Sequence, residues 1–198
     1  MRLHRLPPWQ EWIAEPIVYD VGAVPPVRLE DYRLRLSGEV QEVVDLGWEA
    51  TQRLPHVRVR RDFHCVTTWS AREIVWDGAA ACALFERTPI ERGERRALAR
   101  SRDGYSTCIP VDAFTRRNSL IADRMNGEPL TTEHGAPAQL VVPSLYAWKN
   151  ATYMEELEFL SERSPGFWEE RGYHDRGAPL REERFHSSPA VVKEEGSG

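Results

Sequence analysis

Apolar and polar residues alternate in two stretches of the chain, as they do in strands with one buried face. Residues 32–37 read YRLRLS and end at Gly38, and residues 57–60 read VRVR and lead directly into Phe63. Residues 140–142 (LVV) form a short apolar run before Pro143, which is typical of a buried strand stopped by its proline. These patterns predict three strands.

Helix and turn signals are short and lie between these strands. Helices are expected over residues 48–52, 79–85 and 111–115, the second because it is rich in alanine. Tight turns are expected at Asp77-Gly78, Asp103-Gly104 and Asn126-Gly127. Short strands with a few short helices predict a mixed, mainly β, α+β domain. We expect residues 1–30 to form an extended arm, residues 31–187 the domain, and residues 188–198 a flexible tail.

Composition excludes several classes of protein. The 198 residues are 41% hydrophobic and 29% charged, which does not fit a disordered, collagen-like or coiled-coil chain. The net charge of −5 gives no general attraction to nucleic acid. No run of 18 apolar residues predicts a membrane span, and the first residues lack the apolar stretch of a signal peptide, so a cytoplasmic location is expected. The 3 cysteines include no Cys-x-x-Cys, which argues against a disulfide framework and a zinc finger.

Residues 62–70 (DFHCVTTWS) carry the main chemical signal. They place the Cys65 thiol in a loop at the end of a predicted strand, where a thiolate can serve as a nucleophile or as a soft metal ligand. His64 is its neighbour, but neighbouring side chains of an extended segment point to opposite faces. The residues alone therefore leave a structural and a functional role for Cys65 both open.

Five ordered blocks of sequence resemble the sulfite-oxidase-like family of molybdopterin-dependent oxidoreductases, in its small stand-alone branch. They cover nearly residues 30 to 185. The blocks are residues 31–38 (DYRLRLSG), the Cys65 segment, residues 103–110 (DGYSTCIP), residues 125–149 with MNGEPL, HGAP, LVVP and YAWK, and residues 166–174 with GFWE and GYH.

The resemblance implies a molybdenum cofactor and a role for each matching residue. Cys65 would be the protein ligand to molybdenum, and tungsten could replace that metal. Tyr105 would be the active-site tyrosine, whose phenol can hydrogen-bond a metal oxo group or a bound oxyanion. The cofactor-binding residues implied are Phe63, His64, Cys65, His134, Gln139, Lys149, Asn150 and Thr152.

Three positions depart from the family pattern. Gln139 and Thr152 stand where an arginine and a lysine are usual, which removes two positive charges from the expected phosphate end. Cys108 stands where a polar residue of the second pocket loop is more common. Cofactor affinity is the property that the first two departures put in question.

The resemblance implies oxygen-atom transfer on a small sulfur-containing substrate. After Cys65 the chain has no cation until Arg72, and we expect Trp69 to form the floor of the pocket, which favours a neutral sulfoxide over the sulfite dianion. The sequence shows no haem signal, so a separate electron-transfer partner is expected. Two alternatives are a carrier or interaction module with a weakened cofactor site, and a cysteine hydrolase using Cys65 with His64 or His134.

Overall fold

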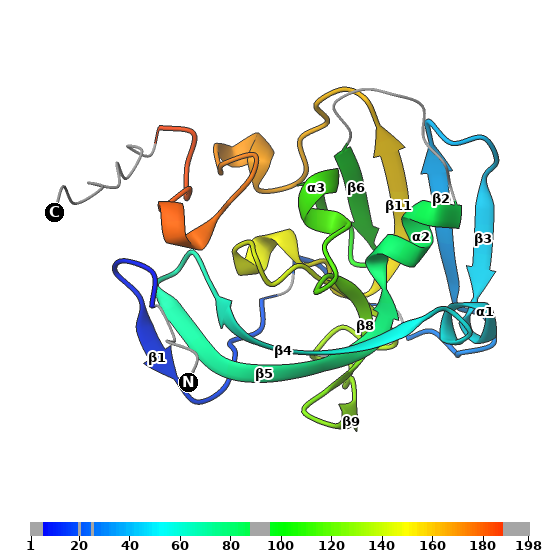
Figure 1. Ribbon diagram of the computed structural model, residues 1–198, viewed down its shortest axis with the longest axis horizontal. Helices are drawn as coiled ribbons and strands as arrows, with labels where there is room; N and C mark the ends of the chain where they lie inside the picture. Colours follow the sequence, from blue (N-terminus) through cyan, green and yellow to red (C-terminus); the bar gives the residue numbers. More distant parts are fainter. Residues whose placement is uncertain (1–5, 20, 25, 88–95, 188–198) are drawn as a thin grey trace, which may run out of the picture.

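The first of two sheets contains the strands that lead to the Cys65 loop (Figure 1). The computed structural model describes residues 6–19, 21–24, 26–87 and 96–187. Within them, this six-stranded sheet has the order β1-β5-β8-β10, with β4 paired to β5 and β9 paired to β8. The strands are β1 Glu11–Ile13, β4 His56–His64, β5 Trp69–Ala80, β8 Leu120–Met125, β9 Glu128–Pro129 and β10 Gln139–Val141.

The second sheet has five strands in the described residues, in the order β3-β2-β11-β6-β7. They are β2 Arg33–Gly38, β3 Val44–Gly47, β6 Arg96–Ser101, β7 Ser106–Pro110 and β11 Met154–Leu160. The helices are α1 Trp48–Gln52, α2 Ala81–Arg87 and α3 Val111–Phe114, with 3₁₀ turns η1 Ala147–Lys149, η2 Glu169–Arg171 and η3 Pro179–Arg181. This mainly β architecture with short helices confirms the α+β prediction. In the described part of the chain, no helix has the length and apolar character needed to cross a membrane.

Most of the predicted elements are present. Residues 33–37 of the alternating stretch lie in β2, in which Leu34 and Leu36 are buried while Arg33 and Arg35 face solvent. Residues 57–60 lie in β4, residues 140–141 in β10, and the helices expected near 48–52 and 111–115 are α1 and α3. The turn expected at Asn126-Gly127 joins β8 to β9, and both of its residues have positive φ. The tail expected over residues 188–198 lies outside the described residues.

The turn predicted at Asp77-Gly78 is wrong, because both residues lie inside β5. The register between β5 and β8 shifts at this point, and β8 comes very close to the glycine. A Cβ atom on Gly78 would lie 2.0 Å from the carbonyl oxygen of Ile121. Gly78 therefore permits a close approach of two strands, which is the other common reason for a glycine within a strand. The same strand runs on to Ala80, so α2 begins two residues later than the predicted helix.

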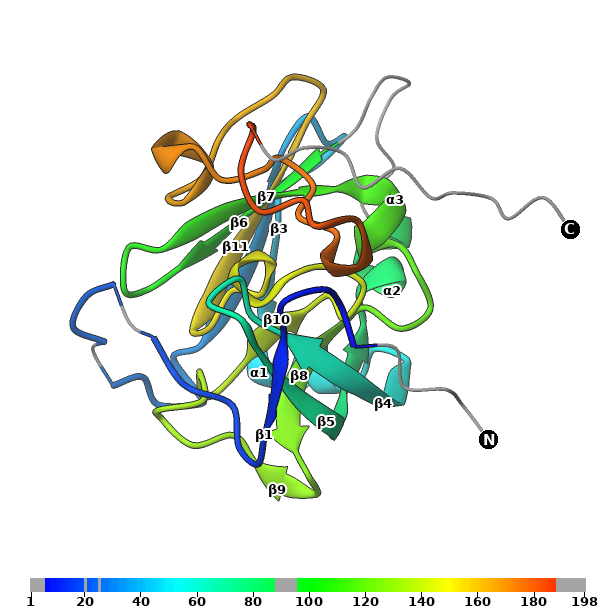
Figure 2. The ribbon, with the colours of Figure 1, turned by 90° about the vertical axis from the view of Figure 1, so that its left-hand side faces the viewer.

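The hairpin of β4 and β5 presents the Cys65 loop, residues 65–68. The Cys65 N–H donates to the Trp69 carbonyl over 2.9 Å, and the Thr68 N–H donates to the Cys65 carbonyl over 3.2 Å. Thr68 has a φ of 74°, the left-handed conformation that closes the turn. The N-terminal arm adds β1 beside β5 in parallel, and Figure 2 shows β1 next to β5, with the orange to red C-terminal segment above.

Candidate active site

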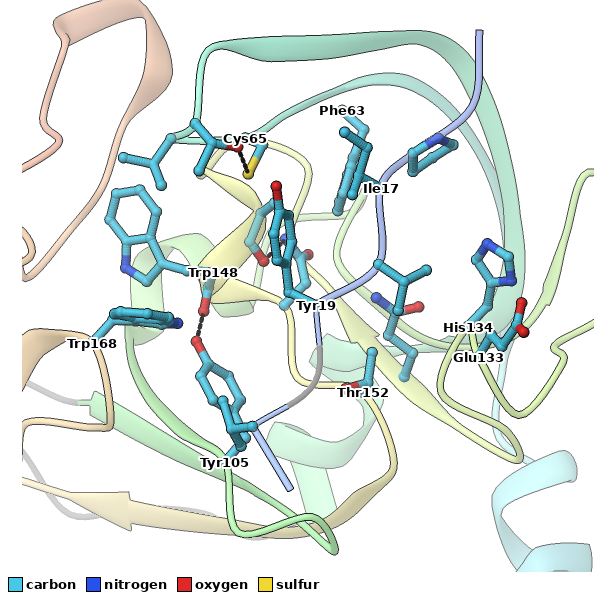
Figure 3. Close-up of a pocket in the computed structure, with 18 of the residues that line it drawn as sticks. Ile17, Tyr19, Phe63, Cys65, Tyr105, Glu133, His134, Trp148, Thr152 and Trp168 are labelled. Carbon is cyan, nitrogen blue, oxygen red and sulfur yellow. Dashed lines mark hydrogen bonds between the residues drawn. The ribbon is translucent and has the colours of Figure 1, made fainter. Parts of the chain in front are cut away.

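A cavity of about 390 Å³ lies beside the Cys65 loop (Figure 3). Its walls come from five parts of the chain: the hairpin of β4 and β5, the N-terminal arm, the turn between β6 and β7, residues 125–152 and the C-terminal segment. The lining residues used below are Ile17, Tyr19, Phe63, Cys65, Val66, Thr67, Asp103, Tyr105, Glu133, His134, Gln139, Trp148, Asn150, Thr152, Trp168 and Tyr173. Among the described lining residues, none is Lys or Arg, and most are apolar or aromatic.

The Cys65 thiol faces this cavity although the residue is only 5% exposed. Its sulfur accepts a hydrogen bond from Thr67 Oγ1 over 3.1 Å, which is drawn in Figure 3. Burial raises the pKa of the thiol, and the Thr67 hydrogen bond and the charge of Arg184 act in the opposite direction. A buried sulfur that is reached only from the cavity suits a ligand to a metal bound there better than a freely exposed nucleophile.

His64 does not join Cys65 at the cavity. Its Nδ1 lies 2.7 Å from Ser70 Oγ, on the far side of the strand, and the residue is not among those that line the cavity. His134 lines the cavity, but its Nδ1 lies 2.9 Å from Thr131 Oγ1. In the described structure no hydrogen bond joins either imidazole to the Cys65 sulfur, so the geometry gives no support to a cysteine hydrolase.

Tyr105 follows β6 and lines the cavity opposite the Cys65 loop. Its phenol donates a short hydrogen bond to the Trp148 carbonyl. Burial is the main reason that the pKa of this phenol lies well above its usual value, and the Glu169 carboxylate raises it further. Tyr105 therefore stays protonated near neutral pH, and its single proton is held by Trp148. Only its oxygen is left to accept a hydrogen bond from a molecule in the cavity.

The structure does not bring Lys149 to the cavity. Its ammonium donates to the carbonyls of Cys108 and Asp175, each over 2.7 Å, and to the Glu169 carboxylate. Three acceptors use all three N–H bonds of the ammonium. No N–H of the ammonium therefore remains for a cofactor phosphate. These partners hold the side chain in the protein interior, away from the cavity. Cys108 is buried in β7 and also does not line the cavity.

The remaining predicted residues lie together at the polar end of the cavity. Gln139, Asn150, Thr152 and His134 all line it. The Asn150 amide is already engaged, since its oxygen accepts the Val142 N–H and its nitrogen donates to the Ala147 carbonyl. Glu133 lies beside His134, which is the one basic residue among the described lining residues.

Aromatic residues that sequence reasoning did not place form the other walls. Trp69 is not the floor of the cavity. It packs on Phe63, with ring centroids 6.2 Å apart, and only Phe63 lines the cavity. The indoles of Trp148 and Trp168 and the ring of Tyr173 take its place, as Figure 3 shows for the two tryptophans. The 7 Trp of the chain were a signal for an aromatic pocket, but not for which Trp lines it.

The arm residues Ile17 and Tyr19 also line the cavity, although Tyr19 is 59% exposed. Figure 3 shows both side chains on the arm, which passes Phe63 and Thr152. The sequence of residues 1–30 does not predict that these two residues line a cavity, because they belong to no helix or strand. They are the least predictable part of the site.

Comparison with known proteins assigns the family. The family model described as the oxidoreductase molybdopterin binding domain matches residues 21–168. The chain therefore belongs to this family, that of sulfite oxidase, and is a molybdopterin oxidoreductase.

Individual relatives agree with this assignment. The chain is similar to the uncharacterized oxidoreductase YuiH of Bacillus subtilis, with 37% identity over 182 residues that cover 91% of the chain and 92% of the relative. It is also similar to the protein-methionine-sulfoxide reductase catalytic subunit MsrP of Gluconobacter oxydans, with 27% identity over 69% of the chain and 49% of the relative. The sulfane dehydrogenase SoxCD of Paracoccus pantotrophus has the same fold, with a TM-score of 0.64 and 19% identity over 70% of the chain and 40% of the solved chain.

The residues of the cavity fit a molybdenum cofactor. Cys65 offers a buried sulfur to the metal, and the aromatic walls suit the flat pterin. The Trp148 indole N–H is buried and has no hydrogen-bond partner within the described structure, so an acceptor on a bound group would satisfy it. Gln139, Thr152 and His134 can donate hydrogen bonds to the phosphate of the cofactor. Gln139 and Thr152 are neutral, and charged side chains in their place would bind the phosphate more strongly.

Proposed function

We propose that this protein transfers an oxygen atom at a molybdenum centre held by Cys65, and that it reduces a neutral sulfoxide in preference to oxidising sulfite. The observation that carries the proposal is the Cys65 sulfur, which is buried on every side except that of the cavity. When bound, the cofactor supplies the two-electron redox change and the exchange of oxygen. The protein supplies the sulfur ligand and the shape of the cavity.

The choice of substrate rests on the charge of the cavity. A dianion such as sulfite needs cationic partners when it leaves water. The described lining residues include no Lys or Arg, whereas Asp103 and Glu133 are acidic. A sulfoxide is neutral, and its two carbon substituents can pack on Trp148, Trp168 and Tyr173.

The residues nearest the cavity have distinct tasks in this proposal. Reduction of a sulfoxide to a sulfide consumes two electrons and two protons and releases one water molecule. Tyr105 does not deliver these protons at neutral pH, because its pKa is well above its usual value and its proton is held by the Trp148 carbonyl. We therefore assign Tyr105 to positioning, and assign proton delivery to solvent. The electrons come from a separate one-electron carrier, and we propose that both proteins act in the cytoplasm.

The test combines metal analysis with two assays. The purified protein is expected to contain molybdenum or tungsten and to show a thiolate-to-metal charge-transfer band in the visible spectrum. Cys65→Ser should lose the band and the tightly bound metal, whereas Cys82→Ser should keep both. Sulfoxide reduction with a reduced viologen should have a higher kcat/KM than sulfite oxidation with ferricyanide.

Each result overturns a separate part of the proposal. Tight metal binding and full turnover in Cys65→Ser would refute the ligand assignment. Faster turnover of sulfite than of sulfoxides would refute the substrate class. A wild-type protein that holds no metal after gentle purification and turns over neither substrate would instead support a carrier or interaction module. The neutral side chains of Gln139 and Thr152 and the position of Lys149 favour this alternative.

A further inference from the structure

Two segments of the chain lie outside residues 21–168, the part that the family model matches. They are the beginning of the arm, residues 6–19, and the C-terminal segment, residues 169–187. Both reach the Cys65 loop, although they are separated from it by more than fifty residues on one side and a hundred on the other.

Gln10 joins the start of the loop to β5, the strand that follows it. Its amide nitrogen donates to the Cys65 carbonyl over 2.8 Å, and its amide oxygen accepts from Ser70 Oγ over 2.9 Å. Gln10 is only 5% exposed, so neither contact is readily replaced by water. The Ser70 hydroxyl has one proton, which goes to Gln10, so His64 Nδ1 must be the donor in its own contact with Ser70. His64 thus belongs to the support of the loop.

The backbone next to Gln10 strengthens this link. The Glu11 N–H donates to the Thr68 carbonyl over 2.8 Å, and Glu11 pairs with Trp69 at the start of the parallel register between β1 and β5. The carbonyls at both ends of the loop, those of Cys65 and Thr68, are therefore bound by neighbouring residues of the arm.

Arg184 holds the middle of the loop from the C-terminal segment. Its guanidinium donates a short hydrogen bond to the Val66 carbonyl, a second bond over 3.3 Å to the Pro8 carbonyl and a third over 2.8 Å to the Glu182 carboxylate. Its side chain is 14% exposed. A planar group with several fixed N–H donors is suited to bridging three separate segments in this way.

We infer that Gln10 and Arg184 are positioning residues that together hold the Cys65 loop so that the thiol faces the cavity. The inference rests on the proposed function in one respect, which is that Cys65 is the metal ligand. On the loop itself, both residues bind backbone carbonyls, and neither forms a hydrogen bond with the sulfur. Because Arg184 also binds Pro8, the arm and the C-terminal segment support each other as well as the loop.

The test compares matched substitutions. Gln10→Met removes both amide contacts at nearly constant size, and its control is Gln52→Met, which loses a single side-chain hydrogen bond to Asp123 away from the cavity. Arg184→Met is paired with Arg181→Met, in the same segment but 74% exposed. Arg184→Lys keeps the charge without the planar fork. Gln10→Glu is the milder second variant, since it keeps the size but cannot donate to the Cys65 carbonyl.

Hydrogen exchange of the loop gives a direct readout, measured by mass spectrometry on the full chain. The amides of Cys65 and Thr68 should exchange roughly tenfold faster in Gln10→Met and Arg184→Met, because each loses hydrogen bonds that hold the loop closed. The charge-transfer band should shift or broaden and the molybdenum content should fall in both. Arg184→Lys should lie between Arg184→Met and wild type, and the two control variants should match wild type.

The outcomes separate this inference from the proposed function. If Cys65→Ser loses the metal while Gln10→Met, Gln10→Glu and Arg184→Met keep wild-type exchange and an unchanged band, the inference is wrong and the function stands. If Cys65→Ser keeps the metal, the ligand assignment fails, and faster exchange in Gln10→Met still supports the contacts on the loop. Equal hydrogen exchange in the test variants and their controls would overturn the inference that Gln10 and Arg184 hold the loop, whether or not Cys65 binds the metal.

Discussion

Lys149 and Glu169 form an ion pair in which neither side chain has any exposed surface. The same Glu169 oxygen accepts a hydrogen bond from Thr107 Oγ1 over 2.8 Å, so the pair joins η1, η2 and β7. Burial lowers the pKa of Lys149, and the Glu169 carboxylate opposes that change. Lys149 therefore supports the wall of the cavity that carries Trp148, its neighbour in η1.

Removing Lys149 alone is expected to be costly, because Glu169 would be left as an uncompensated buried charge. Lys149→Met should lower the free energy of unfolding by about 3–5 kcal/mol. The double variant Lys149→Met, Glu169→Leu should recover most of this loss, because it removes both charges. Urea unfolding of the two variants and wild type checks the expectation, which is wrong if the double variant is as unstable as the single one.

Thr67 is expected to tune the metal through the sulfur. Thr67→Val removes the hydrogen bond to Cys65, which makes the thiolate a stronger electron donor. The charge-transfer band should move to lower energy, and the reduction potential of the metal should fall. Thr68→Val is the control, since its hydroxyl bonds to the Thr67 carbonyl. Visible spectroscopy and redox titration measure both effects, and equal spectra for the two variants would contradict the assignment.

Gln139→Arg is expected to strengthen retention of the cofactor. Gln139 lies in β10 at the polar end of the cavity and is 6% exposed. A guanidinium there would form charge-assisted bonds to a phosphate, roughly twice as strong as those of a neutral amide. Molybdenum should be lost more slowly during dialysis than from wild type or from Gln52→Arg. Unchanged or faster loss would count against the placement of the phosphate beside Gln139.

Asp112 gives the expected pH dependence. Arg176 donates to both of its carboxylate oxygens, over 3.0 and 2.6 Å, and these hydrogen bonds lower the pKa of Asp112. Because the folded-state pKa is lowered, the stabilisation is complete above the unfolded value of about 3.9 and is lost as the pH falls through the folded value.

Asp112→Asn should therefore cost up to about 1 kcal/mol at pH 7, since the pair is partly exposed. The difference from wild type should shrink toward zero at about pH 3 and below. Urea unfolding at several pH values measures it, and Arg176→Gln should show the same trend. A difference that stays constant with pH would show that the pair does not stabilise the fold.

Local pattern was sufficient where one face of a strand is buried or where a turn needs a special backbone. β2 follows from the alternation of Leu34 and Leu36 with arginines, and the turn after Met125 follows from Asn126-Gly127. Asp77-Gly78 has the same local appearance, but the approach of β8, which comes from more than forty residues away, decides its conformation. No local pattern contains that contact.

The site also has residues that local sequence predicts and residues whose position depends on contacts made only in the fold. Cys65 and Tyr105 both line the cavity, as their positions in the sequence blocks imply. Lys149 was assigned by resemblance to the phosphate, but its direction is set by Glu169 and by two carbonyls that only the fold brings together. Gln10 and Arg184 lie in segments without periodicity, so their partners could not be read from spacing.

The contacts of Gln10 and Arg184 on the Cys65 loop end on main-chain oxygens, which every amino acid provides. The residue at position 66 faces the cavity, yet its side chain takes no part in these contacts. A substitution at position 66 can therefore change the shape of the cavity while the hydrogen bonds that hold the loop remain. Such a division would let one scaffold acquire new substrates without rebuilding its metal centre.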